Sequence, residues 1–213
     1  MIFIIRHGQT DLNKAKALLG RSDVPLNEEG RRQAEEARDR FAAEGIRFAH
    51  VYSSPLVRAV DTARIIAEEV PLSLDERLIE MDYGPYEGMD LRSPAPEVLA
   101  FFRDFAHHPA PNGMEPLPQV VGRMGAFMEE LRECIADLRT GAAEPKTSAV
   151  ESQTDASEPN ILISTHAVAM KGILEYLTPD SQGSYWSKYI GNCAVYTTEL
   201  MPDGTFSVPQ EYN

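Results

Sequence analysis

Short apolar segments recur along the chain, and their patterns predict β-strands. Residues 2–5 and 161–164 are unbroken, Ile-rich runs, which are typical of strands buried on both faces. Residues 48–52 predict a further strand. Residues 193–200 alternate between apolar and polar positions, and residues 206–208 are expected to form an edge strand.

Segments with helical periodicity lie between and after these strands. Asn27 is a capping residue type followed by two glutamates, and Ser54 precedes a proline that suits a first helical turn. The predicted helices cover residues 28–45, 55–69, 120–138 and 168–177. The alternation of strands with helices predicts an α/β fold with helices on both faces of the sheet.

Two segments depart from this alternation. Residues 89–118 hold six prolines and an aromatic cluster, and we interpret them as a cap-like insertion with a short helix that covers part of a site. Residues 141–160 are polar and low in aromatics, which predicts a flexible loop. The length of 213 residues fits one domain that spans residues 1–213 and carries both excursions.

Composition narrows the class of protein. The net charge of −13 argues against a nucleic-acid partner, and any site for an anion must be a concentrated local one. Cys134 and Cys193 are far apart and read as reduced residues. The apolar run at the N-terminus is too short for a signal peptide or a membrane span, so we expect a cytoplasmic protein without membrane attachment.

Two histidines follow Ile-rich strands at equivalent positions. His7 comes after residues 2–5, and His166 comes after residues 161–164. If these strands are neighbours, both imidazoles enter one crevice at the carboxyl ends of the strands. Arg6 precedes His7, and Arg58 would be the fourth residue of a helix that begins at Pro55. Taken alone, each residue has an ordinary structural interpretation, such as a surface ion pair or a hydrogen-bonded histidine. Together with the two helix starts they suit a phosphoryl group.

The motifs around these residues resemble the signatures of the histidine phosphatase superfamily, the phosphoglycerate mutase-like enzymes. Five blocks occur in the family's order and span nearly the whole chain. The blocks are Arg6-His7-Gly8-Gln9-Thr10 with Asn13, residues 20–26, residues 53–59, residues 78–84 and residues 163–166. The resemblance implies a three-layer α/β/α sandwich with a mostly parallel central sheet.

The resemblance also implies catalytic roles. His7 would attack phosphorus and become phosphohistidine, so one ring nitrogen must be neutral while the other donates to a fixed acceptor. Glu80 would protonate the leaving alkoxide and then activate water, although taken alone it could be a surface carboxylate. Arg6, Arg58 and His166 would hold the phosphoryl oxygens. No metal and no cofactor is needed in this scheme.

Binding roles are implied for a second group of residues. Asn13 and Arg21 would line the entrance, and Gln9 and Thr10 would donate to the substrate through backbone or side chain. Ala167 stands where relatives usually carry glycine, so backbone access to the phosphate is expected to be tighter there.

The family's chemistry leaves three functions open. The phosphoryl group can pass to water or to a second alcohol, and residues 89–118 do not resemble the corresponding stretch of the mutases, so we favour a phosphatase over a mutase. A non-catalytic phospho-ligand binding protein is the third alternative, disfavoured because the nucleophile, the arginines and the acid are all present. The expected partner is a small phosphorylated metabolite, handled by a monomer or homodimer. The natural substrate stays open.

Overall fold

A six-stranded sheet forms the centre of the protein in a computed structural model that describes residues 1–105, 107–140 and 159–212. The strands are β1 (Ile2–Arg6), β2 (Phe48–Ser53), β3 (Leu72–Leu74), β4 (Asn160–Thr165), β5 (Val195–Thr198) and β6 (Gln210–Tyr212). Their order across the sheet is β3-β2-β4-β1-β5-β6. The first four of these strands run parallel, whereas β5 and β6 pair antiparallel.

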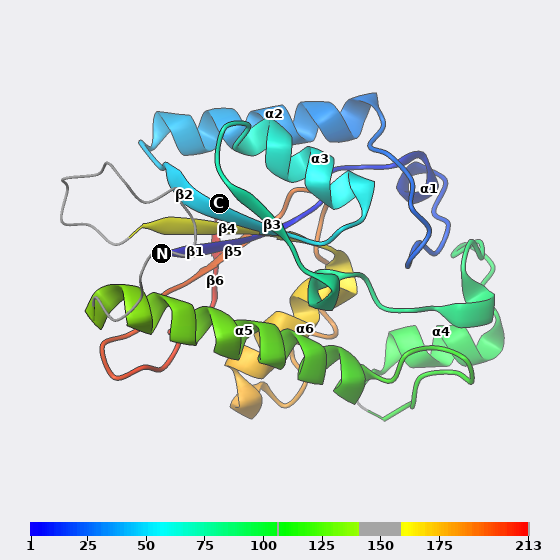
Figure 1. The fold of residues 1–213 in the computed structure, drawn as a ribbon. Helices are drawn as coiled ribbons and strands as arrows, with labels where there is room; N and C mark the ends of the chain where they lie inside the picture. Colours follow the sequence, from blue (N-terminus) through cyan, green and yellow to red (C-terminus); the bar gives the residue numbers. More distant parts are fainter. Residues whose placement is uncertain (106, 141–158, 213) are drawn as a thin grey trace.

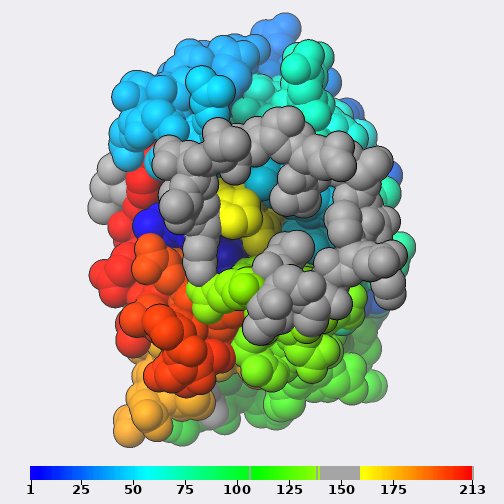
Figure 2. Space-filling model, turned by 60° about the vertical axis from the view of Figure 1, so that its left-hand side comes forward, coloured from blue at the N-terminus to red at the C-terminus, as the bar shows by residue number. Residues whose placement is uncertain are grey.

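Helices cover both faces of this sheet, which confirms the predicted three-layer arrangement. The helices are α1 (Asp11–Lys14), α2 (Glu28–Ala43), α3 (Val57–Ile66), α4 (Pro96–Arg103), α5 (Leu117–Thr140) and α6 (Ala167–Leu177). Figure 1 shows α2 and α3 on one face and α5 and α6 on the other. In Figure 2 the yellow and dark-blue residues of β4 and β1 lie between these two layers. None of the helices in the described residues is both long and apolar enough to cross a bilayer.

Alternation along β1 explains why the strand is apolar throughout. Ile2 and Ile4 point to the core beneath α5 and α6, whereas Phe3 and Ile5 point to the core beneath α2 and α3. Successive side chains of a strand face opposite sides of a sheet, so a strand covered on both faces needs apolar residues at every position. All four residues are at most 2% exposed.

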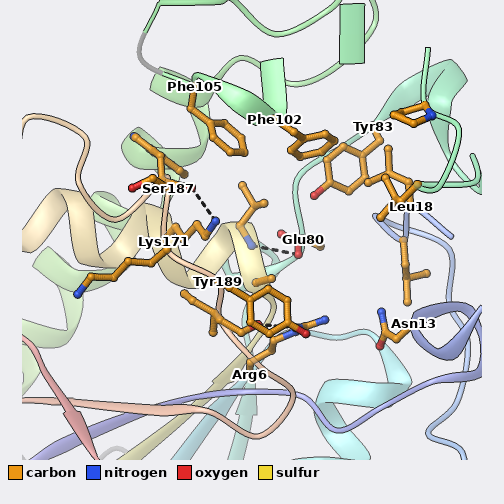
Figure 3. Close-up of a pocket in the computed structure, with 18 of the residues that line it drawn as sticks. Arg6, Asn13, Leu18, Glu80, Tyr83, Phe102, Phe105, Lys171, Ser187 and Tyr189 are labelled. Atoms are coloured by element: carbon orange, nitrogen blue, oxygen red, sulfur yellow. Dashed lines mark hydrogen bonds between the residues drawn. The ribbon is translucent and has the colours of Figure 1, made fainter. Parts of the chain in front are cut away.

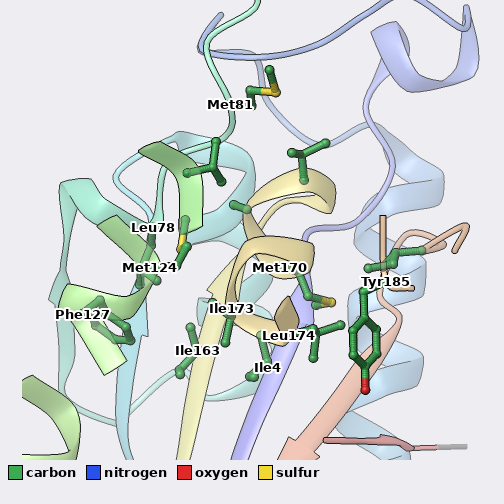
Figure 4. Packing of buried hydrophobic residues seen from close by; sticks show 14 of the residues in the cluster. Ile4, Leu78, Met81, Met124, Phe127, Ile163, Met170, Ile173, Leu174 and Tyr185 are labelled. Atoms are coloured by element: carbon green, nitrogen blue, oxygen red, sulfur yellow. The ribbon is translucent and has the colours of Figure 1, made fainter. Parts of the chain in front are cut away.

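The core beneath α5 and α6 is the larger of the two. Figure 4 shows Ile4 and Ile163 of the sheet beneath Ile173 and Leu174 of α6, with Met124 of α5 nearby. All five residues are 0% exposed. Fully burying one such side chain contributes about 1.5–3 kcal/mol, so this packing holds α6 firmly against the sheet.

Several element boundaries differ from the sequence-based expectation. Helix α3 begins at Val57 rather than Pro55 and ends at Ile66, with no side-chain cap. The predicted edge strand at residues 206–208 was wrong, because Phe206 forms only an isolated bridge and the edge is β6. Strand β3 was not predicted from its three residues. Except for its last two residues, the predicted flexible loop at 141–160 lies outside the described residues.

Candidate active site

The two histidines that follow β1 and β4 lie in one place, as their equivalent strand ends predicted. The strands pair in parallel, with Arg6 opposite Thr165, so His7 and His166 leave the sheet side by side. The backbone N–H of His7 donates to the carbonyl of Thr165 at 2.9 Å. The imidazole centroids are 5.0 Å apart.

The hydrogen bonds of His7 orient the ring for nucleophilic attack. Its Nδ1 lies 2.7 Å from the carbonyl oxygen of Gly8, which can only accept, so Nδ1 carries the proton and Nε2 has a lone pair. Burial, together with the nearby Arg6 and Arg58 guanidiniums, holds the pKa of His7 well below 6.5. The ring is therefore neutral at physiological pH, and Nε2 is the nitrogen that carries the lone pair.

Two buried guanidiniums flank this histidine. Arg6 is 9% exposed and donates from Nη1 to the carbonyl of Ile190 at 2.6 Å. Arg58 is fully buried, and its Nε lies 3.3 Å from Nε2 of His7. Burial lowers the pKa of Arg58 to about 10, against the opposing effect of the Glu80 carboxylate. Both guanidiniums therefore remain charged at neutral pH and make the base of the site locally positive.

Arg58 reaches this position from the second residue of α3, not the fourth residue of a helix beginning at Pro55. Its Nη atoms donate to the carbonyl oxygens of Gly20 at 2.6 Å and Ser22 at 2.7 Å. These two bonds tie the loop that holds residues 20–22 to the base of the site.

His166 lies beneath His7 and is fully buried. Its Nε2 forms a 2.7 Å hydrogen bond with the hydroxyl of Ser54, the residue predicted as a helix cap. Its Nδ1 and the Nε of Arg6 are buried without a hydrogen-bond partner among the described residues. Buried polar nitrogens are nearly always paired, so these two atoms mark the base of the site as a place for an oxygen-rich ligand.

Glu80 occupies the N-terminus of α6, which the sequence suggested as a second phosphate-binding helix end. Its carboxylate accepts from the backbone N–H groups of Ala169 at 2.9 Å and Val168 at 3.2 Å. A third bond comes from the N–H of Met81 at 2.9 Å. An acidic side chain is stabilised at that dipole end, so the helix holds Glu80 rather than leaving its N–H groups to the substrate.

The backbone that carries Glu80 is held by a buried ion pair. Nη1 of Arg123 donates to the carbonyls of Arg77 and Ile79, both at 2.6 Å. Its Nε and Nη2 donate to the two carboxylate oxygens of Glu115 at 2.8 Å and 3.1 Å. A planar guanidinium forms such paired bonds with little freedom of movement, so Arg123 fixes the chain next to Glu80.

Arg21, predicted at the entrance, joins this ion-pair network instead. Its guanidinium lies 3.3 Å from Glu115 and 3.4 Å from Asp82, and its Nε donates weakly to the carbonyl of Glu80 at 3.4 Å. Its side chain is not among those that line the pocket. Arg21 therefore lies near the site as predicted, but it contacts the backbone and the acidic side chains around Glu80.

The other predicted binding residues divide into two groups. Asn13 and Ala167 line the pocket. Gln9 and Thr10 do not, because their polar groups are used locally. The side-chain oxygen of Gln9 accepts from Asn27 at 3.1 Å, and Thr10 forms a capping box at the start of α1. These two residues shape the loop after His7.

The pocket itself has a volume of about 450 Å³ and opens above Arg6, His7 and Glu80. Residues 89–118, the predicted cap-like insertion, contribute Phe102 and Phe105 to its wall. Figure 3 shows these rings with Tyr83 on one side of the pocket, opposite Arg6 and Tyr189. Residues 186–190 also line it.

Lys171 lines the same pocket and was missed by the sequence analysis. The available signal was a single lysine in the otherwise apolar stretch 168–174 of α6. Within the described residues, no group of three or more histidine, cysteine, aspartate or glutamate side chains is arranged to hold a metal ion.

The fold and the pocket define a class of α/β protein with a pocket at the carboxyl edge of a mostly parallel sheet. Arg6 and His7 line this pocket, whereas Arg58 and His166 are buried next to His7 and do not line it. The particular family is shown by sequence comparison. The chain belongs to the histidine phosphatase superfamily (branch 1), whose family model matches residues 2–210.

Individual relatives carry different activities in their names. Fructose-2,6-bisphosphatase TIGAR of Xenopus tropicalis is 40% identical over 135 residues, covering 60% of this chain and 48% of that protein. The match thus spans about half the length of that relative. The 2,3-bisphosphoglycerate-dependent phosphoglycerate mutase 2 of Gloeobacter violaceus is 26% identical, covering 97% of this chain and 89% of its own length.

Solved structures show the same fold. Mycobacterial glucosyl-3-phosphoglycerate phosphatase superposes with a TM-score of 0.77 at 24% identity, covering 100% of this chain and 97% of that chain. Bacillus stearothermophilus YhfR gives a TM-score of 0.75 at 27% identity, covering 97% and 94%.

Proposed function

We propose that the protein is a phosphatase that hydrolyses a phosphomonoester through a phosphohistidine at His7. The observation that carries this proposal is the tautomer of His7. The bond from Nδ1 to the carbonyl of Gly8 leaves Nε2 with its lone pair toward the charged base of the site. Attack at phosphorus needs a neutral nitrogen held in line with the leaving oxygen.

The remaining residues supply the other parts of the reaction. In the first step Nε2 of His7 bonds to phosphorus, the bond to the leaving oxygen breaks, and Glu80 gives that oxygen a proton. In the second step Glu80 takes a proton from water as the water oxygen bonds to phosphorus and the nitrogen–phosphorus bond breaks. Arg6, Arg58 and His166 hold the phosphoryl oxygens, and loss of one such contact costs on the order of 10²–10³ in rate.

Transfer to a second hydroxyl is the alternative use of the same intermediate, and several relatives are named as phosphoglycerate mutases or probable ones. The proline-rich segment 89–118 favours water as the acceptor, because it differs from the stretch that covers the pocket in mutases. A mutase would interconvert 2- and 3-phosphoglycerate faster than it releases phosphate from any ester.

The decisive experiment traps the intermediate. Glu80→Gln should form phosphohistidine but hydrolyse it slowly, so a phosphorylated protein that is labile to acid and stable to base should accumulate with p-nitrophenyl phosphate. His7→Ala should show neither phosphoprotein nor hydrolysis. His107→Ala is a suitable control, because His107 is exposed and pairs only with Asp104. Hydrolysis that survives in His7→Ala contradicts the proposal.

A further inference from the structure

Lys171 is an unusual residue for its place in the fold. It is 9% exposed and lies in a stretch of α6, residues 168–174, whose other members are all apolar and buried. It follows Ala167 by four positions, so both residues lie on the same face of the helix, and both line the pocket. Lysines are almost never this buried unless their charge has a partner.

The protein itself provides only part of that partner. Nζ of Lys171 donates to the carbonyl oxygen of Trp186 at 2.8 Å and lies 5.3 Å from the ring centroid of Phe105. Among the described residues no carboxylate forms an ion pair with it, and Glu80 takes its hydrogen bonds from backbone N–H groups instead. An ammonium has three donor hydrogens, so donors remain for a ligand in the pocket.

We propose that Lys171 binds a second anionic group, carboxylate or phosphate, on the leaving-group part of the substrate. The substrates would then be phosphomonoesters that carry a further anion. This inference rests on the proposed function, since it assumes that the transferred phosphoryl group lies over His7. Figure 3 shows Lys171 and Arg6 on different sides of Glu80, so a ligand held by both cations passes the proposed acid.

The charge state of Lys171 supports the assignment. Burial lowers the pKa of Lys171 to about 8, the Glu80 carboxylate opposes this effect and Arg6 adds to it. The ammonium is therefore still mostly protonated at pH 7. A buried ammonium with one carbonyl partner is costly for the free protein, and an anionic ligand removes that cost. The local positive charge also offsets the net charge of −13, which repels anions at long range.

The test compares substrates that differ only in the second anion. 3-Phosphoglycerate and glycerol 3-phosphate differ by a carboxylate in place of a hydroxymethyl group, and glycerol 1,3-bisphosphate adds a phosphate instead. Wild-type kcat/KM should favour at least one anionic member by about 10- to 10²-fold, the range expected for a hydrogen bond to a charged group. Lys171→Gln, which keeps a donor for the carbonyl of Trp186, should bring that ratio to within about threefold of one.

Two controls separate direct contact from other effects. Activity of Lys171→Gln toward glycerol 3-phosphate reports folding within the same sample, and Lys171→Arg should retain the preference. Lys14→Gln removes the same formal charge from an exposed lysine that does not line this pocket and should change the ratio by less than about threefold. The anionic substrate whose kcat/KM falls more in Lys171→Gln identifies the second anion as carboxylate or phosphate.

Several results would overturn the inference. These are a wild type without preference for either anionic substrate, a preference that survives in Lys171→Gln, or one lost equally in Lys14→Gln. If the wild type hydrolyses none of the three compounds, the proposed function is still tested separately, by hydrolysis of p-nitrophenyl phosphate and by the phosphohistidine that it leaves on the protein. The role of Lys171 is then decided by calorimetry with 3-phosphoglycerate and with glycerol 1,3-bisphosphate. Weaker binding of either compound to Lys171→Gln than to the wild type supports the role, and equal binding of both compounds refutes it.

Discussion

Arg123→Gln removes four hydrogen bonds that hold the chain on either side of Glu80. Two go to Glu115, whose side chain is only 8% exposed, and two go to the carbonyls of Arg77 and Ile79. Breaking a fully buried ion pair by removing one partner costs about 3–5 kcal/mol of stability, and the Arg123–Glu115 pair is partly buried, so the loss should be smaller. Misplacing a catalytic group by about 1 Å costs about 10²-fold in rate. The variant should therefore be less stable and also impaired in proton transfer from Glu80.

The assay separates these two effects through the leaving group. An alkyl phosphate needs a proton on its leaving oxygen, whereas 2,4-dinitrophenyl phosphate does not. We expect kcat/KM of Arg123→Gln to fall about 10²-fold on the alkyl ester and less than about threefold on the dinitrophenyl ester. Both activities are measured below the unfolding temperature of the variant, so that its lower stability does not affect the ratio of the two kcat/KM values.

Two further variants sharpen this result. Arg132→Gln makes the same change on the same helix but disturbs only a surface pair with Glu129, so both activities should stay within about twofold. Glu115→Gln with Arg123→Gln should recover part of the stability without restoring the alkyl-ester rate. The reason is that no carboxylate is left without its main partner, while Arg21 keeps its ion pair with Asp82. An equal fall on both esters, or no fall on the alkyl ester, would show that Arg123 does not position the acid.

Three other predictions follow from the site and its support. Burial, with the neighbouring guanidiniums, holds the pKa of His7 and of His166 well below 6.5. The unfolded chain therefore takes up protons below pH 6.5 that the folded chain does not, so stability is full above that pH and falls as the pH drops. His166→Gln should remove its share of this dependence, and urea unfolding at pH 7 and pH 5 measures it; an unchanged dependence contradicts the assignment. For the same reason, the fall of kcat/KM at acidic pH should not have an apparent pKa near 6.5 that belongs to His7. If the titration of His7 did produce an apparent pKa near 6.5, the ring would be exposed. Gly30→Ala would place a Cβ 2.1 Å from a backbone oxygen of the loop after His7, so we expect the protein to lose about 1–3 kcal/mol of stability and to have a lower kcat. In Gly122→Ala the added Cβ meets nothing within 4 Å, so thermal unfolding should show a neutral or stabilising effect.

Local sequence signals were sufficient where the physics is local. The cap of α2 was predicted because the side chain of Asn27 accepts from the N–H of Gly30 only three residues away, at 2.9 Å. The start of α3 was misplaced because Ser54, which resembles a cap, bonds instead to His166, 112 residues distant. Nothing near Ser54 in the chain could indicate that partner.

Taken by itself, the sequence determined which residues we propose to carry the chemistry and roughly where the strands and helices lie. Two apolar runs, each ending in a histidine, were enough to predict that His7 and His166 could share a crevice, because the burial of strands leaves a pattern along the chain. Tertiary structure alone decided how the polar groups pair. Glu80 rather than substrate occupies the N-terminus of α6, Arg21 turns to Glu115, and Lys171 enters the pocket. These outcomes depend on contacts between residues far apart in sequence, so periodicity and spacing carry no record of them.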